Sequence, residues 1–151
     1  MNNERYLFRG KPKGGEWIYG DLLWNNGVPI IVMQVDRTYI GTSDTGQGKH
    51  WHIETPAYKV DSETVGQWSG LIDSKGVKIF EGDQLFVCAG YSSFVKFEDG
   101  MFVSVYSHPE DGETLPLSEV IGKDTEVIFD NDKAKEEWSK EKACSSYCKA
   151  K

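Results

Sequence analysis

The chain has 151 residues, 38% of them hydrophobic, and its 24 Asp and Glu outnumber its 17 Lys and Arg, which gives a formal net charge of -7. A chain of this length can bury enough surface to fold without disulfides, and the composition excludes collagen-like and low-complexity classes. The acidic balance argues against a basic groove for duplex nucleic acid and against an anionic membrane surface. With no signal peptide, no apolar run of membrane-spanning length and three cysteines, an odd number, we expect a soluble protein in the bacterial cytoplasm.

Apolar and polar residues alternate with period two over most of the chain, which predicts short strands. We expect one domain over 1–151, and its first part, about 1–62, is predicted to be a sheet. The expected strands of this part are 6–9, 17–24, 30–35, 50–53 and 57–60. Asn26 and Gly27 tolerate positive φ angles and predict a hairpin turn after the second strand. The polar, glycine-rich stretch 36–49 is predicted to be a mobile loop, interrupted only by Tyr39 and Ile40.

The middle of the chain, about 63–129, has glycines at regular intervals between apolar pairs. Such spacing is typical of tight turns and bends in a coiled sheet, where only Gly adopts the required backbone angles. Strands are expected at 84–88, 94–97 and 101–106, with a hairpin turn at Asp99 and Gly100. These short strands predict a small barrel meander. The residues interpreted as a structural motif are Gly66, Trp68, Gly70, Gly76, Glu81, Gly82 and Asp83.

The period changes only near the C-terminus. Asp and Asn side chains at 130–132 can cap a helix, and strong helix formers follow, so a helix is predicted over about 131–146. Ala134 and Trp138 lie four residues apart and would share one side of it. We therefore expect these two residues to anchor the helix to the body of the protein.

The strongest candidate for a metal-binding or ligand-binding site in the sequence is the stretch around His50 and His52. On a strand these two imidazoles would share a face, and a metal site would need further ligands, for which only Glu54 and His108 are candidates. Two alternate histidines favour a polar strand face over a metal site, so no metal or cofactor is expected. The candidate ligand-binding residues of this region are Arg37, Tyr39, Lys49, His50, Trp51 and His52.

Catalytic patterns are not visible in the sequence. No Ser or Cys lies in a sharp strand-to-helix turn beside a base, as a nucleophile would. Glu81 and Asp83 are paired carboxylates, but in a Glu-Gly-Asp turn they are expected to bind backbone amides. We therefore expect a protein that is not an enzyme.

Three blocks of sequence resemble the YopX family of phage and prophage proteins. They comprise 5–11 with 15–20, 63–71 with 79–83, and 119–122, and they differ from the family chiefly in having Trp68 where Tyr is common. The resemblance implies a mostly β fold of several coiled antiparallel sheets, including an SH3-like barrel, and a phage or prophage origin. It implies no activity, because the function of the family is uncharacterised.

The leading hypothesis is a non-enzymatic phage accessory protein whose β scaffold forms a homo-oligomer and binds a host protein or a small, anionic ligand. The supply of aromatic residues, 5 Trp, 7 Tyr and 7 Phe, exceeds the needs of a small core and favours such contacts. One alternative is a sponge that sequesters a nucleotide second messenger of host defence. Another is a metal-dependent enzyme that uses His50 and His52.

Overall fold

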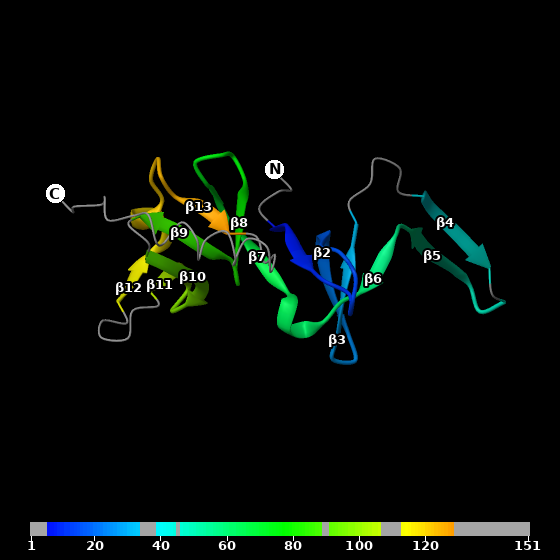
Figure 1. Ribbon diagram of the computed structural model, residues 1–151. Coiled ribbons are helices and arrows are strands. Elements are labelled where there is room, and N and C mark those ends of the chain that lie inside the picture. The colour runs from blue at the N-terminus through cyan, green and yellow to red at the C-terminus, as the bar shows by residue number, and fades with distance from the viewer. Residues whose placement is uncertain (1–5, 34–38, 45, 89–90, 107–112, 129–151) are drawn as a thin grey trace. The chain divides into compact units, whose positions relative to one another are not determined.

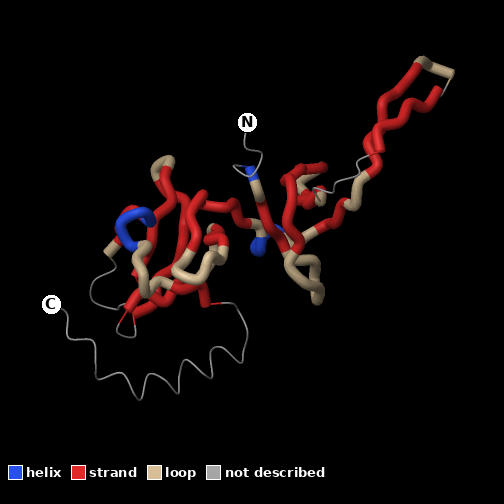
Figure 2. The backbone as a smooth tube through the Cα atoms, turned by 90° about the horizontal axis from the view of Figure 1, so that it is seen from above, coloured by secondary structure: helices blue, strands red, loops and turns tan. Residues whose placement is uncertain are grey.

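The computed structural model describes residues 6–33, 39–44, 46–88, 91–106 and 113–128. Strands form most of the regular structure in these residues, and the helical elements are single short turns (Figure 1, Figure 2). The chain divides into two compact units, Met1–Gln67 (unit 1) and Trp68–Lys151 (unit 2). The prediction of a mostly β protein with antiparallel pairing is confirmed.

Unit 1 is built on a sheet in which the strands have the order β6-β3-β2-β1. At its edge Phe8 and Arg9 pair with Gln67 and Gly66, the first residues of the next strand. The bounds of the strands are β1 Phe8–Gly10, β2 Ile18–Asn25, β3 Val28–Val32, β6 Ala57–Lys59 and β7 Gly66–Ile72.

The predicted turn between β2 and β3 forms as expected. Asn26 has φ 50° and Gly27 has φ 78°, the left-handed angles of a two-residue hairpin turn. The turn sets the register, which places Leu23 opposite Ile30 and leaves Ile31 on the other face, where it is fully buried. The fully buried Ile31 and the exposed Leu23 therefore lie on opposite faces of this hairpin.

The predicted loop over 36–49 is wrong for residues 39–44 and for Lys49. The structure has strand β4 at Tyr39–Asp44 and strand β5 at Lys49–Glu54, which pair as a two-stranded sheet. The turn between them is held in part by the Asp44 carboxylate, whose Oδ1 accepts a hydrogen bond from the Gly46 amide at 3.0 Å. Strand β4 begins with Tyr39 and Ile40, which favour strands. Its remaining residues are Gly, Thr, Ser and Asp, which also favour turns, and for this reason the sequence predicted a loop.

Unit 2 contains a five-stranded sheet of order β12-β11-β10-β9-β13, and Figure 1 shows its strands side by side. The rest of β7 pairs with β8 across an irregularity between Trp68 and Ile72. The strands β7, β8, β12 and β13 and the helix α1 were not among the elements expected from the sequence. The bounds are β8 Lys78–Phe80, β9 Gln84–Cys88, β10 Tyr91–Glu98, β11 Met101–Tyr106, β12 Thr114–Pro116, α1 Leu117–Val120 and β13 Glu126–Ile128.

The core of unit 2 is one apolar cluster that the five-stranded sheet covers on one side. Its central side chains are nearly or fully buried and come from β8, β9, β10, α1 and β13. They are Ile79, Leu85, Val95, Leu117 and Val127. Residues far apart in sequence thus share one interior, which fixes the meander against α1.

Two finer expectations are not decided by these residues. In the strand order of unit 2, β12 and β13 are the outer strands, so closure into an SH3-like barrel stays a prediction. The C-terminal helix expected over 131–146 lies outside the described residues.

Candidate functional site

The predicted ligand-binding residues belong to the β4–β5 hairpin. His50 and His52 are two positions apart on β5 and pair with Ser43 and Gly41 of β4. Trp51 pairs with Thr42, Lys49 with Asp44, and Tyr39 with Glu54. Arg37 lies outside the described residues. The pairing therefore brings five of the six candidates into one hairpin.

One of the alternative functions, a metal-dependent enzyme, requires that this hairpin bind a metal ion through His50 and His52. In the part of the chain that the structure describes, no three His, Cys, Asp or Glu side chains gather as metal ligands. His108, one of the two further ligands considered, lies outside the described residues. The other, Glu54, lies two residues beyond His52 at the end of β5.

Gly76 and Gly82 of the glycine-spaced motif lie in turns, and Gly70 lies within β7, where its pairing with β8 is irregular. Gly70, Gly76 and Gly82 have φ angles of 84°, 82° and 84°, which side-chain-bearing residues rarely adopt. In the Glu-Gly-Asp turn the Asp83 carboxylate is buried, and its Oδ2 accepts the Phe80 amide hydrogen bond at 2.8 Å. The carboxylate stabilises the turn that leads from β8 into β9.

A second buried carboxylate, that of Asp73, ties two segments together. Its Oδ1 accepts hydrogen bonds from the amides of Lys75 and Val77, each at 2.8 Å. Its Oδ2 accepts the amide of Val127 at 3.0 Å, across 54 residues of sequence. The Ser74 amide adds a bond of 2.9 Å to the carbonyl of Thr125. We call this set of contacts the Asp73 clasp, and it fastens the β7–β8 turn to β13.

Next to the clasp lies an exposed ion pair. Lys75 Nζ donates a hydrogen bond to Glu126 Oε2 at 2.8 Å. This hydrogen bond, together with the negative charge of Glu126, raises the pKa of Lys75. Because the pair is exposed to solvent, its contribution to stability is small.

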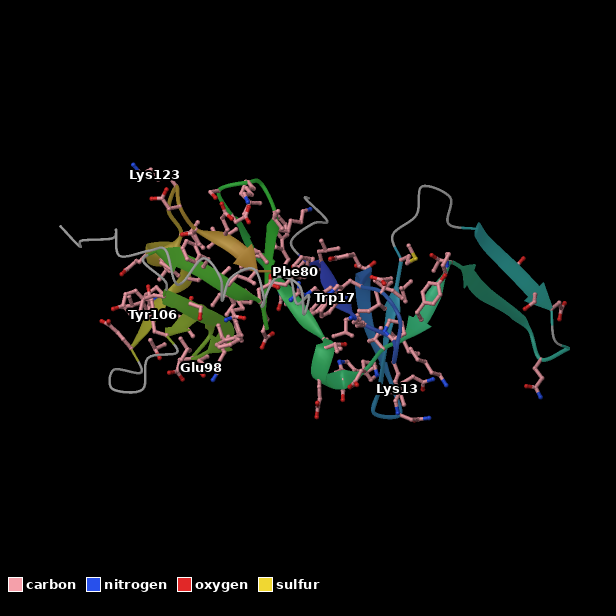
Figure 3. The ribbon with its side chains drawn as sticks, viewed as in Figure 1. Lys13, Trp17, Phe80, Glu98, Tyr106 and Lys123 are labelled. Carbon is pink, nitrogen blue, oxygen red and sulfur yellow. The ribbon has the colours of Figure 1, made fainter. Side chains whose placement is uncertain are left out.

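Two of the tryptophans carry a cation on the face of the ring. The guanidinium carbon of Arg9 lies 4.3 Å from the ring centre of Trp17 in unit 1, among the side chains of β1 and β2 (Figure 3). In unit 2, Lys78 Nζ lies 4.6 Å from the ring centre of Trp68, whose Nε1 donates to the Leu71 carbonyl at 2.9 Å. Such contacts use the rings for internal packing.

The sequence did not single out an apolar surface on β2 and β3 of unit 1. On β2 and β3, the face opposite to Ile31 carries five apolar side chains in register, and we call it the open face. It comprises Tyr19, Leu23, Val28, Ile30 and Val32. Three of them are exposed, with Tyr19 at 41%, Leu23 at 54% and Val28 at 39%. A face of this kind marks an interaction surface more often than isolated apolar residues do. The sequence does contain an indication of this face, because β2 and β3 have apolar residues at positions that point to both sides of the sheet.

Fold and surfaces together define a small, mostly β protein with an apolar strand face open to solvent. The model of the YopX protein family matches residues 7–130, so the chain belongs to this family. The resemblance drawn from the three sequence blocks is thereby confirmed. No curated protein and no solved structure matches the chain. None of the helices in the described residues has the length and hydropathy needed to cross a bilayer.

Proposed function

We propose that this protein is a phage-type accessory protein that acts by binding, and that its scaffold is a homo-oligomer assembled through the open face of unit 1. Membership of the YopX family supports the phage-type role. The observation that carries the assembly is the exposure of Leu23, Tyr19 and Val28 on one strand face. A second copy of the chain presents the same apolar face and can bury it by sheet-on-sheet packing.

The charges around the open face suit contact between two copies. Asp21 and Lys59 lie on the same side of the sheet as Leu23, since Asp21 pairs with Val32 and Lys59 with Ile30. Arg9 pairs with Tyr19 and lies on this side as well, so the face has one negative and two positive charges beside its apolar centre. In a two-fold contact, Asp21 of one copy can face Lys59 of the other.

Light scattering coupled to size-exclusion chromatography tests the assembly. We expect the wild-type chain to elute with a multiple of 17.0 kDa. Replacing Leu23 by Arg should shift the population to 17.0 kDa, because a charge would be buried in the contact. Trp24 is the matched control, since it is also 54% exposed but lies on the opposite face of β2. Trp24→Arg should leave the mass unchanged.

Two results would contradict the assembly. One is a clean wild-type monomer at high concentration. The other is equal dissociation by Leu23→Arg and Trp24→Arg, which would indicate a general loss of structure. Circular dichroism of both variants separates dissociation from unfolding.

We further propose that the assembled scaffold binds a host protein or a small ligand and catalyses no reaction. This proposal is supported by the buried carboxylates of Asp73 and Asp83, because both oxygens of Asp73 and Oδ2 of Asp83 accept hydrogen bonds from backbone amides. The meander β9–β10–β11 in unit 2, with short strands and hairpin turns, supports an SH3-like arrangement of that unit. The β4–β5 hairpin is the proposed ligand contact.

A further inference from the structure

Strand β6 ends the sheet of unit 1, and the bonds on either side of it show which of its backbone groups the sheet uses. The amide of Met33 donates to the carbonyl of Pro56 at 2.8 Å, and the amide of Val60 donates to the carbonyl of Pro29 at 3.1 Å. Hydrogen-bonded and non-hydrogen-bonded pairs alternate along an antiparallel ladder. Between these two bonds, Tyr58 is therefore the residue of β6 whose N–H and C=O groups face β3.

The N–H and C=O groups of Ala57 and Lys59 consequently point away from β3, along the outer edge of the sheet. Among the residues that the structure describes, no strand pairs with this edge. All three residues of β6 are exposed, and Tyr58 is 44% exposed although it pairs with the fully buried Ile31. An exposed edge strand is a template on which another strand can pair.

The two edges of the five-stranded sheet of unit 2 are protected, which sets β6 apart. Starting from the bond between the Tyr106 amide and the Glu113 carbonyl, the same alternation turns Pro116 of β12 outward, where it has no N–H to donate. In β13 the amide of Val127 is bonded to Oδ2 of Asp73 at 3.0 Å. Strand β6 contains no proline, and in the described part of the chain no side chain accepts a hydrogen bond from its amides. Because protein sheets normally protect their edges, this open edge indicates a pairing partner.

We propose that the β6 edges of two copies pair with each other, antiparallel, about a two-fold axis beside Tyr58. In this register Ala57 of each copy lies opposite Lys59 of the other, and each such pair exchanges two hydrogen bonds through the outward-pointing groups. Tyr58 lies opposite its own equivalent in a non-hydrogen-bonded pair, where the Cα atoms are about 4.5 Å apart and an aromatic pair is favourable. The strand is thus its own complement, and the two lysines are not directly opposed.

This inference rests on the proposed assembly through the open face. A few hydrogen bonds and one aromatic pair between three-residue strands do not offset the freedom that two separate chains lose on association. Two copies joined by their open faces still have two β6 edges, and a second such pair of copies presents the same two edges. Contacts that form together raise the effective concentration for one another, so the edges link two pairs into a closed assembly of four chains.

Disulfide trapping in the full chain tests the pairing. Cβ atoms at a non-hydrogen-bonded pair come within the range of a disulfide, so Tyr58→Cys should join two copies. Lys59→Cys is the matched control, because residue 59 is also exposed but its Cα would lie more than about 7 Å from its equivalent, too far for a bridge. In a glutathione redox buffer, with the native cysteines in place, mass spectrometry of the digested protein counts each bridge. We expect at least tenfold more bridges between two residues 58 than between two residues 59.

Light scattering coupled to size-exclusion chromatography gives the number of chains. The wild-type protein should have four times the mass of one 17.0 kDa chain. Ala57→Pro removes an outward amide without removing a bond to β3, so it should halve this mass. Ala57→Val keeps the amide and should leave the mass unchanged. If Ala57→Pro alters the circular dichroism, Tyr58→Lys replaces it, because two lysines would then face each other across the two-fold axis.

The two measurements separate failure of the edge pairing from failure of the open-face assembly. A two-chain wild-type mass with equal bridge yields at 58 and 59 overturns the edge pairing and leaves the open-face assembly standing. A one-chain mass with the tenfold excess at 58 contradicts the open-face assembly and supports the edge pairing. A one-chain mass with equal yields overturns both.

Discussion

The two units achieve order by different means. Among the described residues of unit 1, Ile31 is fully buried and Val60 nearly so, and backbones approach each other closely at glycines. A Cβ on Gly20 would lie 2.0 Å from the carbonyl oxygen of Val32, and one on Gly10 would lie 2.6 Å from Cγ2 of Val60. Unit 1 therefore depends on the absence of side chains at particular positions.

Unit 2 is stabilised by the apolar volume and the hydrogen-bond acceptors of its side chains. It has a contiguous apolar cluster, and polar groups inside it are satisfied by specific partners. The Asp73 clasp accepts three amide hydrogen bonds, and Ser93 and Ser104, both fully buried, bond to each other. Loss of volume or of an acceptor should therefore damage unit 2, whereas added volume should damage unit 1.

The largest effect is expected from removal of the Asp73 carboxylate. Asp73→Ala leaves the amides of Lys75, Val77 and Val127 without their acceptor, and at least the last of these bonds is buried. We expect a loss of about 3 to 5 kcal/mol in the free energy of unfolding, since each unsatisfied buried donor costs about 1 to 3 kcal/mol. Denaturant unfolding measures the loss, and hydrogen exchange should locate the weakening in unit 2.

Asp61→Ala is the control for this change. Asp61 in unit 1 also accepts a backbone hydrogen bond, from the Glu63 amide at 3.1 Å, but the bond is exposed to solvent. Water replaces the lost acceptor there, so the cost should stay below about 1 kcal/mol. Equal losses from the two substitutions would refute the structural importance assigned to the Asp73 clasp.

The second largest loss of stability is expected when side-chain volume is added to unit 1. Gly20→Ala brings a methyl group against the backbone of Val32, which no side-chain rotation can relieve. Separation of β2 from β3 should cost about 2 to 3 kcal/mol. Thermal unfolding measures the loss, and hydrogen exchange should rise at amides of β2 and β3 before those of β9 and β10.

Gly122→Ala supplies the comparison in unit 2. A Cβ at Gly122 would have no atom within 4 Å, and its φ is not in the left-handed region. The melting temperature should stay at or slightly above the wild-type value, because alanine restricts the unfolded chain. If Gly20→Ala were equally harmless, the close approach of β2 and β3 would not be a determinant of unit 1.

Much of this fold is predictable from the sequence, because short stretches of residues determine several of its turns and strands. Asn26 with Gly27, and Asp99 with Gly100, have the positive φ angles that their residue types favour, so the hairpins β2–β3 and β10–β11 were correctly expected. Strands β9 and β11 were also predicted at their observed bounds. Strands β12 and β13 were missed because their stability comes from pairing with β11 and β9, which no local pattern reveals.

The surfaces proposed for contact were predictable only in part. Alternation placed His50 and His52 on a strand, and the structure has them on β5. The open face of unit 1 escaped prediction because Leu23, Ile30 and Ile31 look equally apolar in sequence, and the choice of the buried face is made by register and by packing. The three amide partners of Asp73 were invisible as well, because Val127 lies 54 residues away.

The smallest loss in the free energy of unfolding is expected from substitutions of the two buried serines of unit 2. It is also the most direct test of whether paired polar groups stabilise this unit. Ser104 Oγ donates a hydrogen bond of 2.6 Å to Ser93 Oγ between β11 and β10, with no solvent access to either residue. Ser93→Ala and Ser104→Ala should each cost about 1 to 2 kcal/mol, since each leaves one buried hydroxyl without its partner. The double variant should cost less than the sum by about 1 kcal/mol, because removing both hydroxyls leaves no unsatisfied group in a cluster that is otherwise apolar. Urea unfolding of the four chains gives this coupling free energy. Strict additivity would contradict the view that unit 2 is ordered by paired polar groups, and would assign its stability to the apolar cluster alone.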